Sequence, residues 1–259
     1  MGKEANYTVG TVKKAIRLLK LFDGQNRELT LTQISTLSGI DKSSSFRLLY
    51  TLNEEGFVDY DAESKKYSLG IEIYRLGQLK YRDLDIRKIA KKHLQKFCDV
   101  YNLVSYLGIR NGDHIVMVER VFPYNIPVWA RFFVEDDYRE LYSTGIGRLF
   151  LAEETDTEIE KYFSRVEPKS MTDYTITNKD TLLMLIRQAR IDHYSGNLGE
   201  NEASIHSLCV PIYDHSGKML AGISICGPKG MIWDKNFNVL LEKLQTIACN
   251  ISRECGYNT

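Results

Sequence analysis

Apolar residues near the start of the chain recur at steps of three and four positions, which is the spacing of one face of a helix. They are Val9, Val12, Ile16, Leu18, Leu19 and Phe22. Asp23 and Gly24 follow and supply a stop signal. The pattern predicts a first helix that buries this stripe in a core.

Two further helices are predicted on either side of a short turn. Thr30 and Gln33 have the spacing of a capping box, so a second helix is expected to begin there and to turn Leu37 inward. The turn at residues 39–41 contains a glycine and leads to a third helix over residues 42–55. Two short helices joined by such a turn are typical of a helix-turn-helix.

The third helix has two faces of different character, since successive residues of a helix lie about 100° apart. One face holds Ser45, Leu48, Leu49 and Leu52 and is expected to face the core. The opposite face holds Ser43, Arg47 and Tyr50, with Phe46 on its flank. Arginine can bond guanine and an aromatic ring can contact a thymine methyl, so this second face suits the major groove of DNA.

A hairpin is predicted after the third helix, with strands at residues 57–60 and 65–69 joined by a turn at 61–64. Attached to a helix-turn-helix, such a hairpin forms a wing, and lysines at its tip can contact phosphates. The candidate DNA-binding residues are therefore Lys42, Ser43, Ser44, Phe46, Arg47, Tyr50, Lys65 and Lys66. A winged helix that binds a protein remains the alternative.

The second half of the chain is predicted to form an antiparallel sheet flanked by helices. One hairpin is expected where residues 103–110 and 114–121 flank Asn111-Gly112, the strongest short hairpin signal. A second is expected from 205–213 and 218–226. Helices are expected near residues 147–153, 156–163, 180–190 and 233–255.

A charged stretch with regularly spaced leucines, residues 73–100, lies between these two halves and is interrupted near 83–85. It predicts a linker helix followed by the first helix of the second domain. We therefore expect an α+β chain with a winged helix-turn-helix domain at 1–71, a linker helix at 72–84 and a larger α/β domain at 85–259. A plain amphipathic surface helix is the alternative interpretation of the linker.

The charge of the chain gives only weak evidence on DNA binding. The 259 residues carry no formal net charge, which by itself argues against nucleic acid binding. Residues 1–82, however, carry 13 Lys/Arg and 10 Asp/Glu, whereas the rest carries 21 and 24. The asymmetry supports DNA binding by the first half without demonstrating it.

The five cysteines form no CxxC pair, and Met1-Gly2-Lys3 does not resemble the start of a secretory leader. We therefore expect reduced thiols and a cytoplasmic protein. No apolar run approaches the roughly 20 residues of a membrane-spanning helix, so no membrane partner is expected.

An enzyme or a metal or redox sensor is the alternative function. Cys209 with His206, or Cys226 with His215, could be imagined as catalytic pairs, but neither lies in a recognisable catalytic motif. The histidines and Cys209 fit no zinc spacing, and no phosphate-binding glycine motif is present. We therefore expect no catalytic residue, no metal and no cofactor.

Segments along the whole chain resemble the IclR family of bacterial transcription regulators. They are Lys42-Ser43, Arg47-Leu48-Leu49 and Thr51-Leu52 in the third helix, Tyr67 to Gly70 after the wing, Leu141 to Arg148, and Glu200, Ser207-Leu208 and Ile212 to Asp214. The resemblance implies a GAF-like effector-binding domain at the carboxy terminus. It also implies a homodimer or dimer of dimers that binds a double-stranded DNA operator.

The resemblance further implies an effector pocket in the second domain. Its expected residues are Gly145, Ile146 and Gly147, whose amides open a helix, with Asn197, Ser207 and Ser224 as donors and Ile205 and Cys226 as walls. A small organic acid or aromatic metabolite is expected as the effector. His193, Asn197 and Cys209 depart from the family pattern, so the identity of the ligand does not transfer.

Overall fold

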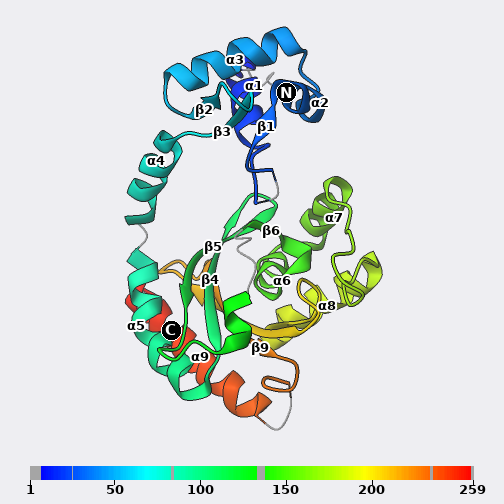
Figure 1. Cartoon of the computed structure of the whole chain (residues 1–259). Helices are drawn as coiled ribbons and strands as arrows, with labels where there is room; N and C mark the ends of the chain where they lie inside the picture. The colour runs from blue at the N-terminus through cyan, green and yellow to red at the C-terminus, as the bar shows by residue number, and fades with distance from the viewer. Residues whose placement is uncertain (1–6, 25, 83–84, 133–137, 234–235, 258–259) are drawn as a thin grey trace. The chain divides into compact units, whose positions relative to one another are not determined.

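The computed structural model describes residues 7–24, 26–82, 85–132, 138–233 and 236–257 (Figure 1). The chain forms two compact units, residues 1–83 and 84–259. The expected interruption near residues 83–85 falls partly outside the described residues. Among the helices described, none is long and apolar enough to cross a membrane.

The first unit is a winged helix-turn-helix followed by one more helix. Its helices are α1 (Gly10–Leu19), α2 (Leu31–Ser38), α3 (Lys42–Glu54) and α4 (Ile71–Arg82). Its strands are β1 (Leu29–Thr30), β2 (Val58–Asp61) and β3 (Lys66–Leu69), antiparallel in the order β1-β3-β2. The predicted wing is the β2–β3 hairpin, and β1 adds a strand that the sequence pattern did not indicate.

The local signals predicted at the two ends of α2 are confirmed, and the structure adds a side-chain cap at the start of α3. The Thr30 side chain accepts the N–H of Gln33 and the Gln33 side chain accepts the N–H of Thr30, which completes the capping box. Gly39 ends α2 at φ 66°, in the left-handed region that glycine adopts without strain. Asp41 caps α3 by accepting the Ser44 N–H at 2.9 Å. These contacts fix the angle between the two helices.

The expected burial of the first apolar stripe is only partly correct. Leu18 and Phe22 are buried in a core with α2, α3 and the sheet. By contrast, Val12 and Ile16 of this stripe are 54% and 48% exposed, and Val9 is also exposed. The expectation that Leu37 of α2 turns inward is wrong as well, because its side chain is 54% exposed. The described part of this small unit places no element over the first turns of α1. The apolar stripe of α1 therefore extends beyond the core of this unit.

The second unit contains a six-stranded antiparallel sheet in the order β6-β5-β4-β9-β8-β7. The strands are β4 (Val104–Asn111), β5 (His114–Val121), β6 (Tyr138–Glu140), β7 (Ser195–Leu198), β8 (Ile205–Tyr213) and β9 (Met219–Pro228). Both predicted hairpins are confirmed, and Gly112 turns the first one at φ 65°. The two edge strands, β6 and β7, were not predicted because they are only three and four residues long.

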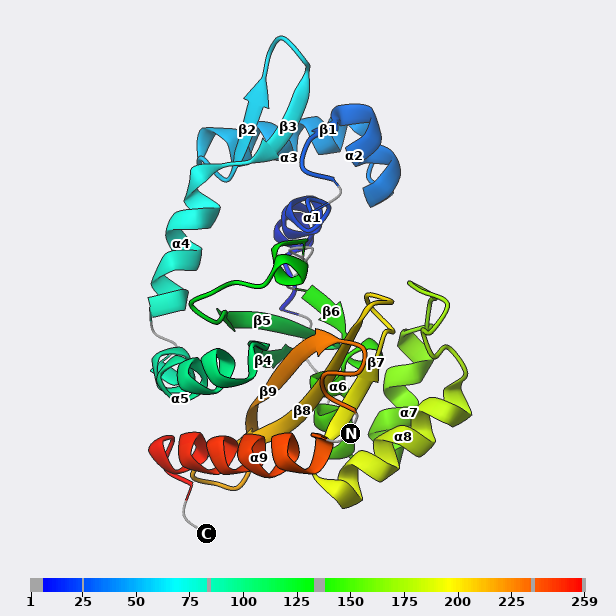
Figure 2. The same cartoon turned by 60° about the horizontal axis from the view of Figure 1, so that its bottom comes forward.

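Helices cover both faces of this sheet (Figure 2). They are α5 (Asp85–Tyr101), α6 (Gly145–Ala152), α7 (Asp156–Arg165), α8 (Lys179–Asp192) and α9 (Phe237–Glu254), with 3-10 turns at Val128–Phe132 and Leu141–Ser143. α6 begins two residues earlier than predicted because Thr144 caps it. α9 begins at Phe237 rather than Trp233, and residues 234–235 are not described.

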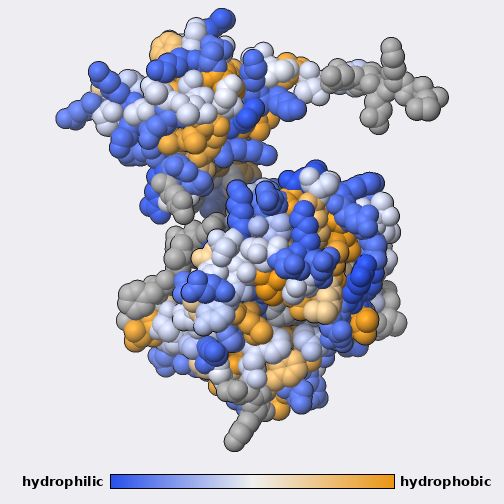
Figure 3. Space-filling view, turned by 90° about the vertical axis from the view of Figure 1, so that its right-hand side faces the viewer, coloured by the Kyte–Doolittle hydropathy of each residue, from blue (hydrophilic) through white to orange (hydrophobic). Residues whose placement is uncertain are grey.

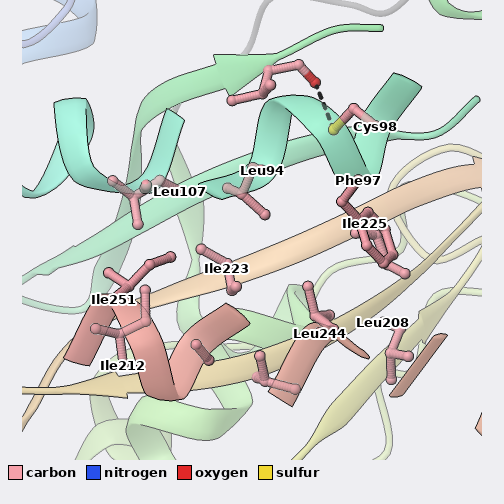
Figure 4. Close-up of a cluster of buried hydrophobic side chains, with 14 of the residues drawn as sticks. Leu94, Phe97, Cys98, Leu107, Leu208, Ile212, Ile223, Ile225, Leu244 and Ile251 are labelled. Atoms are coloured by element: carbon pink, nitrogen blue, oxygen red, sulfur yellow. Dashed lines mark hydrogen bonds between the residues drawn. The ribbon is translucent and has the colours of Figure 1, made fainter. Parts of the chain in front are cut away.

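Two hydrophobic cores result, one on each face of the sheet. The α5 and α9 layer contributes residues such as Leu94 and Leu244, which meet Ile223 and Ile225 of β9 (Figure 4). In the same view Cys98 donates to the Val121 carbonyl oxygen at 3.5 Å. The α6, α7 and α8 layer forms the second core on the opposite face.

His193 ends α8 at φ 54°, a left-handed conformation that strains a residue with a side chain. Replacing His193 with Gly is expected to stabilise the second unit by about 0.5 to 1 kcal/mol, because the relief of strain exceeds the entropy cost of glycine. Denaturant unfolding followed by tryptophan fluorescence measures this. As a control, Gln188→Gly in the α8 interior is expected to destabilise by about 1 kcal/mol.

Candidate functional sites

α3 presents the two faces that its sequence predicted. Ser45 and Leu49 are fully buried, and Leu48 and Leu52 pack against the same core. Phe46 and Tyr50, in contrast, are 50% and 58% exposed, with ring centroids 6.4 Å apart. An exposed aromatic pair on a helix otherwise held by its leucines is available for contact with a partner.

The exposed face of α3 continues into a shallow groove against α1. The groove is lined by Thr11, Lys14, Ser44, Phe46, Arg47, Leu48, Tyr50 and Thr51. Lys42 and Ser43 lie at the exposed N-terminal end of α3. Sequence reasoning missed Thr11 and Lys14, because α1 was interpreted only as a core helix. Lys14 adds a positive charge beside Arg47, as a DNA-facing surface requires.

The two wing lysines are not equivalent. Lys65 is exposed at the tip of the hairpin, with φ 56°. Lys66 begins β3, and its Nζ lies 3.1 Å from Glu28 Oε2. Asp61 stabilises the turn by accepting the Glu63 N–H and the Ser64 hydroxyl. Lys65 is therefore the better placed of the two to reach a phosphate.

The second unit encloses a cavity of about 110 Å³ between the sheet and α6. Among the described residues it is lined by Tyr106, Met117, Arg120, Arg139, Thr144, Gly145, Ile146, Asn197, Asn201, Glu202, Ile205, Ser207, Cys209, Ser224 and Cys226. Seven of the eight predicted pocket residues are in this set. These seven residues lie on three strands and one helix that are far apart in sequence, and the structure brings them together.

Gly147 is the exception, and the expectation that it lines the pocket is wrong. Its N–H donates to the Thr144 hydroxyl at 2.9 Å, so the amide is already used by the helix cap. A Cβ at this position would lie 2.1 Å from the Leu141 carbonyl oxygen. Gly147 therefore allows α6 to pack closely on the preceding 3-10 turn.

Asn197 lines the cavity, but most of its amide group is used within the fold. Its Nδ2 donates to the Ser143 carbonyl at 2.8 Å, and its Oδ1 accepts the Glu200 N–H at 3.0 Å. One N–H of the side chain is left for another acceptor. Asn197 therefore fastens the segment before α6 to the end of β7, in addition to facing the cavity.

Serine and cysteine alternate on the β8–β9 floor of the cavity. Ser207 pairs with Cys226 across the strands, and Cys209 pairs with Ser224. Burial raises the pKa of Cys209 to about 12 and also raises that of Cys226. Both thiols are therefore protonated near neutral pH, and they contribute weakly polar surface rather than reactive thiolate.

The imagined cysteine and histidine pairs do not form. Cys209 faces the cavity, whereas His206 lies an odd number of residues away on β8 and faces the opposite side of the sheet. His215 is exposed in the β8–β9 turn, while Cys226 lies near the other end of that hairpin. Over the described residues, no three His, Cys, Asp or Glu side chains form a cluster suited to a metal ion.

A buried ion pair connects two of the elements that carry cavity residues. Arg148 Nη2 lies 2.6 Å from Glu200 Oε1 and 2.6 Å from the Gly196 carbonyl oxygen, and Nη1 lies 3.1 Å from Glu200 Oε2. The two side chains are only 1% and 4% exposed. The pair joins α6 to the loop after β7. Sequence reasoning noted both residues but did not pair them.

Two family models match the chain on these same two units. The IclR helix-turn-helix domain matches residues 11–62, and the bacterial transcriptional regulator IclR C-terminal domain matches residues 79–253. The chain belongs to the IclR family. It is therefore a DNA-binding transcription regulator of the IclR type, with a helix-turn-helix domain and an α/β effector domain.

This IclR regulator matches two curated transcription regulators over nearly their whole length. The chain is 33% identical to KipR of Bacillus subtilis, covering 95% of this chain and 97% of that protein. It is 29% identical to KdgR of Escherichia coli, covering 97% and 94%. Both relatives are transcription regulators by name.

Solved structures share the fold. An IclR transcriptional regulator from Alicyclobacillus acidocaldarius superposes with a TM-score of 0.79 at 25% identity, over 96% of this chain and all of that one. An IclR homologue from Microbacterium hydrocarbonoxydans, complexed with 4-hydroxybenzoate, superposes with a TM-score of 0.74 at 18% identity, over 95% and 99%.

Proposed function

We propose that this IclR regulator binds a double-stranded operator through α3 and the β2–β3 wing, and that a small organic acid or aromatic metabolite in the cavity changes its affinity. The observation that carries the proposal is the α3 surface, where Phe46, Arg47 and Tyr50 are exposed while the leucines pack inward. That arrangement matches a recognition helix in the major groove.

The cavity supports a small carboxylic acid as effector. Serine hydroxyls and arginine side chains line it beside apolar side chains such as Ile146 and Ile205. The related protein from Microbacterium hydrocarbonoxydans was solved with an aromatic acid, 4-hydroxybenzoate. Mixed polar and apolar walls are typical of pockets that orient small metabolites.

We also propose that the operator-binding form is a homodimer or dimer of dimers. α4 leaves Ile71, Tyr74 and Leu79 at least half exposed, and hydrophobic residues are exposed on both units in Figure 3. A second copy that covers the α4 side chains would remove this apolar surface from water. It would also space two α3 helices for adjacent half-sites. Because a bacterial operator lies in the cytoplasm, we propose the same location for the protein.

Effector control requires that the ligand distinguish two arrangements of the protein. A metabolite that binds both equally well moves no equilibrium, however tight its binding. We propose that occupation of the cavity favours one arrangement of the α4 linkers, so that operator affinity changes.

Operator selection by the full-length protein tests the proposal. Purified protein is incubated with fragmented genomic DNA at low ionic strength, and the bound fragments are sequenced with and without a panel of metabolites. We expect a small set of promoter fragments to be enriched, and at least one metabolite to change that enrichment. No preference for any fragment under any condition would rule out the proposal.

Replacing Lys65 and Lys66 together with Ala is expected to weaken binding to operator and random DNA by similar factors. Phosphate contacts carry no base information, so the preference between the two duplexes should stay unchanged. The logarithmic salt dependence should flatten by about one unit for each lost phosphate contact. Lys65→Ala alone should produce most of the change, because Lys66 pairs with Glu28. Titrations at several salt concentrations measure it.

A further inference from the structure

We propose that Arg120 and Arg139 hold the anionic group of the effector, which therefore lies at the β5–β6 end of the cavity rather than at the start of α6. The inference rests on the proposed effector role of this cavity and specifies its chemistry. The ligand carries a carboxylate or a phosphate monoester, and its less polar part lies toward Ile146 and Ile205.

A bulge in β5 aims Arg120 into the cavity. Leu107 of β4 pairs with Glu119, but the next residue, Gly108, pairs with Met117, so Val118 is an extra residue in β5. An extra residue exchanges the faces of everything beyond it. Regular alternation from Met117 would have placed Glu119 in the cavity. The bulge replaces a carboxylate there with a guanidinium.

The residues around the bulge confirm which side chain faces which way. Glu119 forms an ion pair with Arg87 of α5, on the face of the sheet away from the cavity. Arg120 pairs across the strands with Tyr106, and its guanidinium carbon lies 5.7 Å from the Tyr106 ring centroid. The ring limits the positions that this guanidinium can occupy, which reduces the entropy lost when it binds an anion.

Arg139 of β6 brings a second guanidinium to the cavity. It lies on β6 opposite Ile115 of β5, and its Nη1 is 3.8 Å from the Met171 sulfur. Both arginines line the cavity. Of the described lining residues, Glu202 is the one carboxylate, and it is exposed. Among the described lining residues, the charge is therefore net positive, and both positive charges come from β5 and β6.

The start of α6, where the resemblance placed pocket residues Gly145 to Gly147, has few amides left to bind an anion. The Gly147 N–H is taken by Thr144, and the Ile146 amide lies beside the Cys209 sulfur. A Cβ at Gly145 would lie 2.5 Å from that sulfur, so little space separates the helix start from the cavity floor. An anion finds stronger partners in the two arginines, since charged donors make the stronger hydrogen bonds.

Calorimetric titration of the full-length protein tests the assignment. The probes are benzoate, glutarate and phenyl phosphate, with benzamide as the uncharged counterpart of benzoate. Variants Arg120→Gln and Arg139→Gln remove one charge each, Arg120→Lys keeps it, and Arg165→Gln is the control. Arg165 is exposed, pairs with Asp113 and does not line the cavity. Circular dichroism confirms that each variant is folded.

We expect at least one anionic probe to bind the wild type, and to bind Arg120→Gln and Arg139→Gln at least about tenfold more weakly. Arg120→Lys should retain part of the affinity, Arg165→Gln all of it, and benzamide should bind more weakly than benzoate. The tighter of benzoate and phenyl phosphate identifies the anionic group. Equal binding to wild type and both Gln variants would overturn the assignment, as would benzamide binding as well as benzoate, or no anionic probe binding at all.

These outcomes are separable from the failure of the proposed function. If a metabolite changes operator affinity equally in wild type and in both Gln variants, the regulator proposal stands and the arginine anchor is wrong. If no small molecule changes operator affinity, the effector proposal is wrong, while the titrations still report whether the arginines bind anions.

Discussion

Glu200→Gln is expected to destabilise the second unit by about 3 to 5 kcal/mol, because it leaves the buried Arg148 guanidinium without a counter-charge. The substitution keeps the shape of the side chain and removes only the charge. Arg148 is 1% exposed, and its Nε already has no hydrogen-bond partner among the described residues. Water therefore cannot replace the lost carboxylate without opening the packing between α6 and β7.

Tryptophan fluorescence isolates this effect. The chain has two tryptophans, Trp129 and Trp233, and both lie in the second unit. Denaturant unfolding followed by their emission therefore reports on that unit even if the winged helix unfolds separately.

Two further variants complete the comparison. Arg165→Gln breaks an exposed ion pair with Asp113 and should cost no more than about 1 kcal/mol. The double variant Arg148→Met with Glu200→Gln should recover part of the loss, because no unpaired charge remains buried. Equal costs for Glu200→Gln and Arg165→Gln would contradict the structural role of the buried pair.

Arg47→Ala is expected to lower operator affinity and to remove about 1 to 3 kcal/mol of discrimination at one base pair. Arg47 lies on the exposed face of α3, in the sequence between the aromatic residues Phe46 and Tyr50. It lines the groove together with Lys14 of α1. A guanidinium on this face can bond guanine through two N–H groups, which alanine cannot replace.

Binding to the selected operator and to single-base variants of it measures the loss of discrimination. Arg27→Ala removes the same charge from an exposed position that does not line the α3 groove. We expect it to leave the preference between bases unchanged. If Arg47→Ala keeps the base preference of the wild type, α3 does not dock by this face.

The sequence predicted the parts of the fold that are specified by neighbouring residues. The capping box at Thr30, the turn at Gly39 and the hairpin at Gly112 depend on contacts within a few positions, and all three are present. The burial of Val12 was predicted wrongly, because periodicity shows which residues share a face but not how far the core extends.

The candidate cavity shows a second kind of limit. Seven of its residues followed from the family resemblance, but the resemblance could not reveal that the Gly147 amide is already occupied. Arg120 was not predicted as a cavity residue, because strict alternation along β5 assigns its side chain to the opposite face of the sheet. A bulge leaves no mark in a single sequence, since it depends on how β4 pairs with the strand.

The extra residue at position 118 can be removed without changing which side chains line the cavity. Deleting Val118 would leave Met117 opposite Gly108 and Glu119 opposite Leu107, the pairs that already flank the bulge. Glu119 would then still face Arg87 of α5, and Arg120 would still face the cavity. A gene that lacks this one codon is therefore expected to encode a regulator with the same preference for acids.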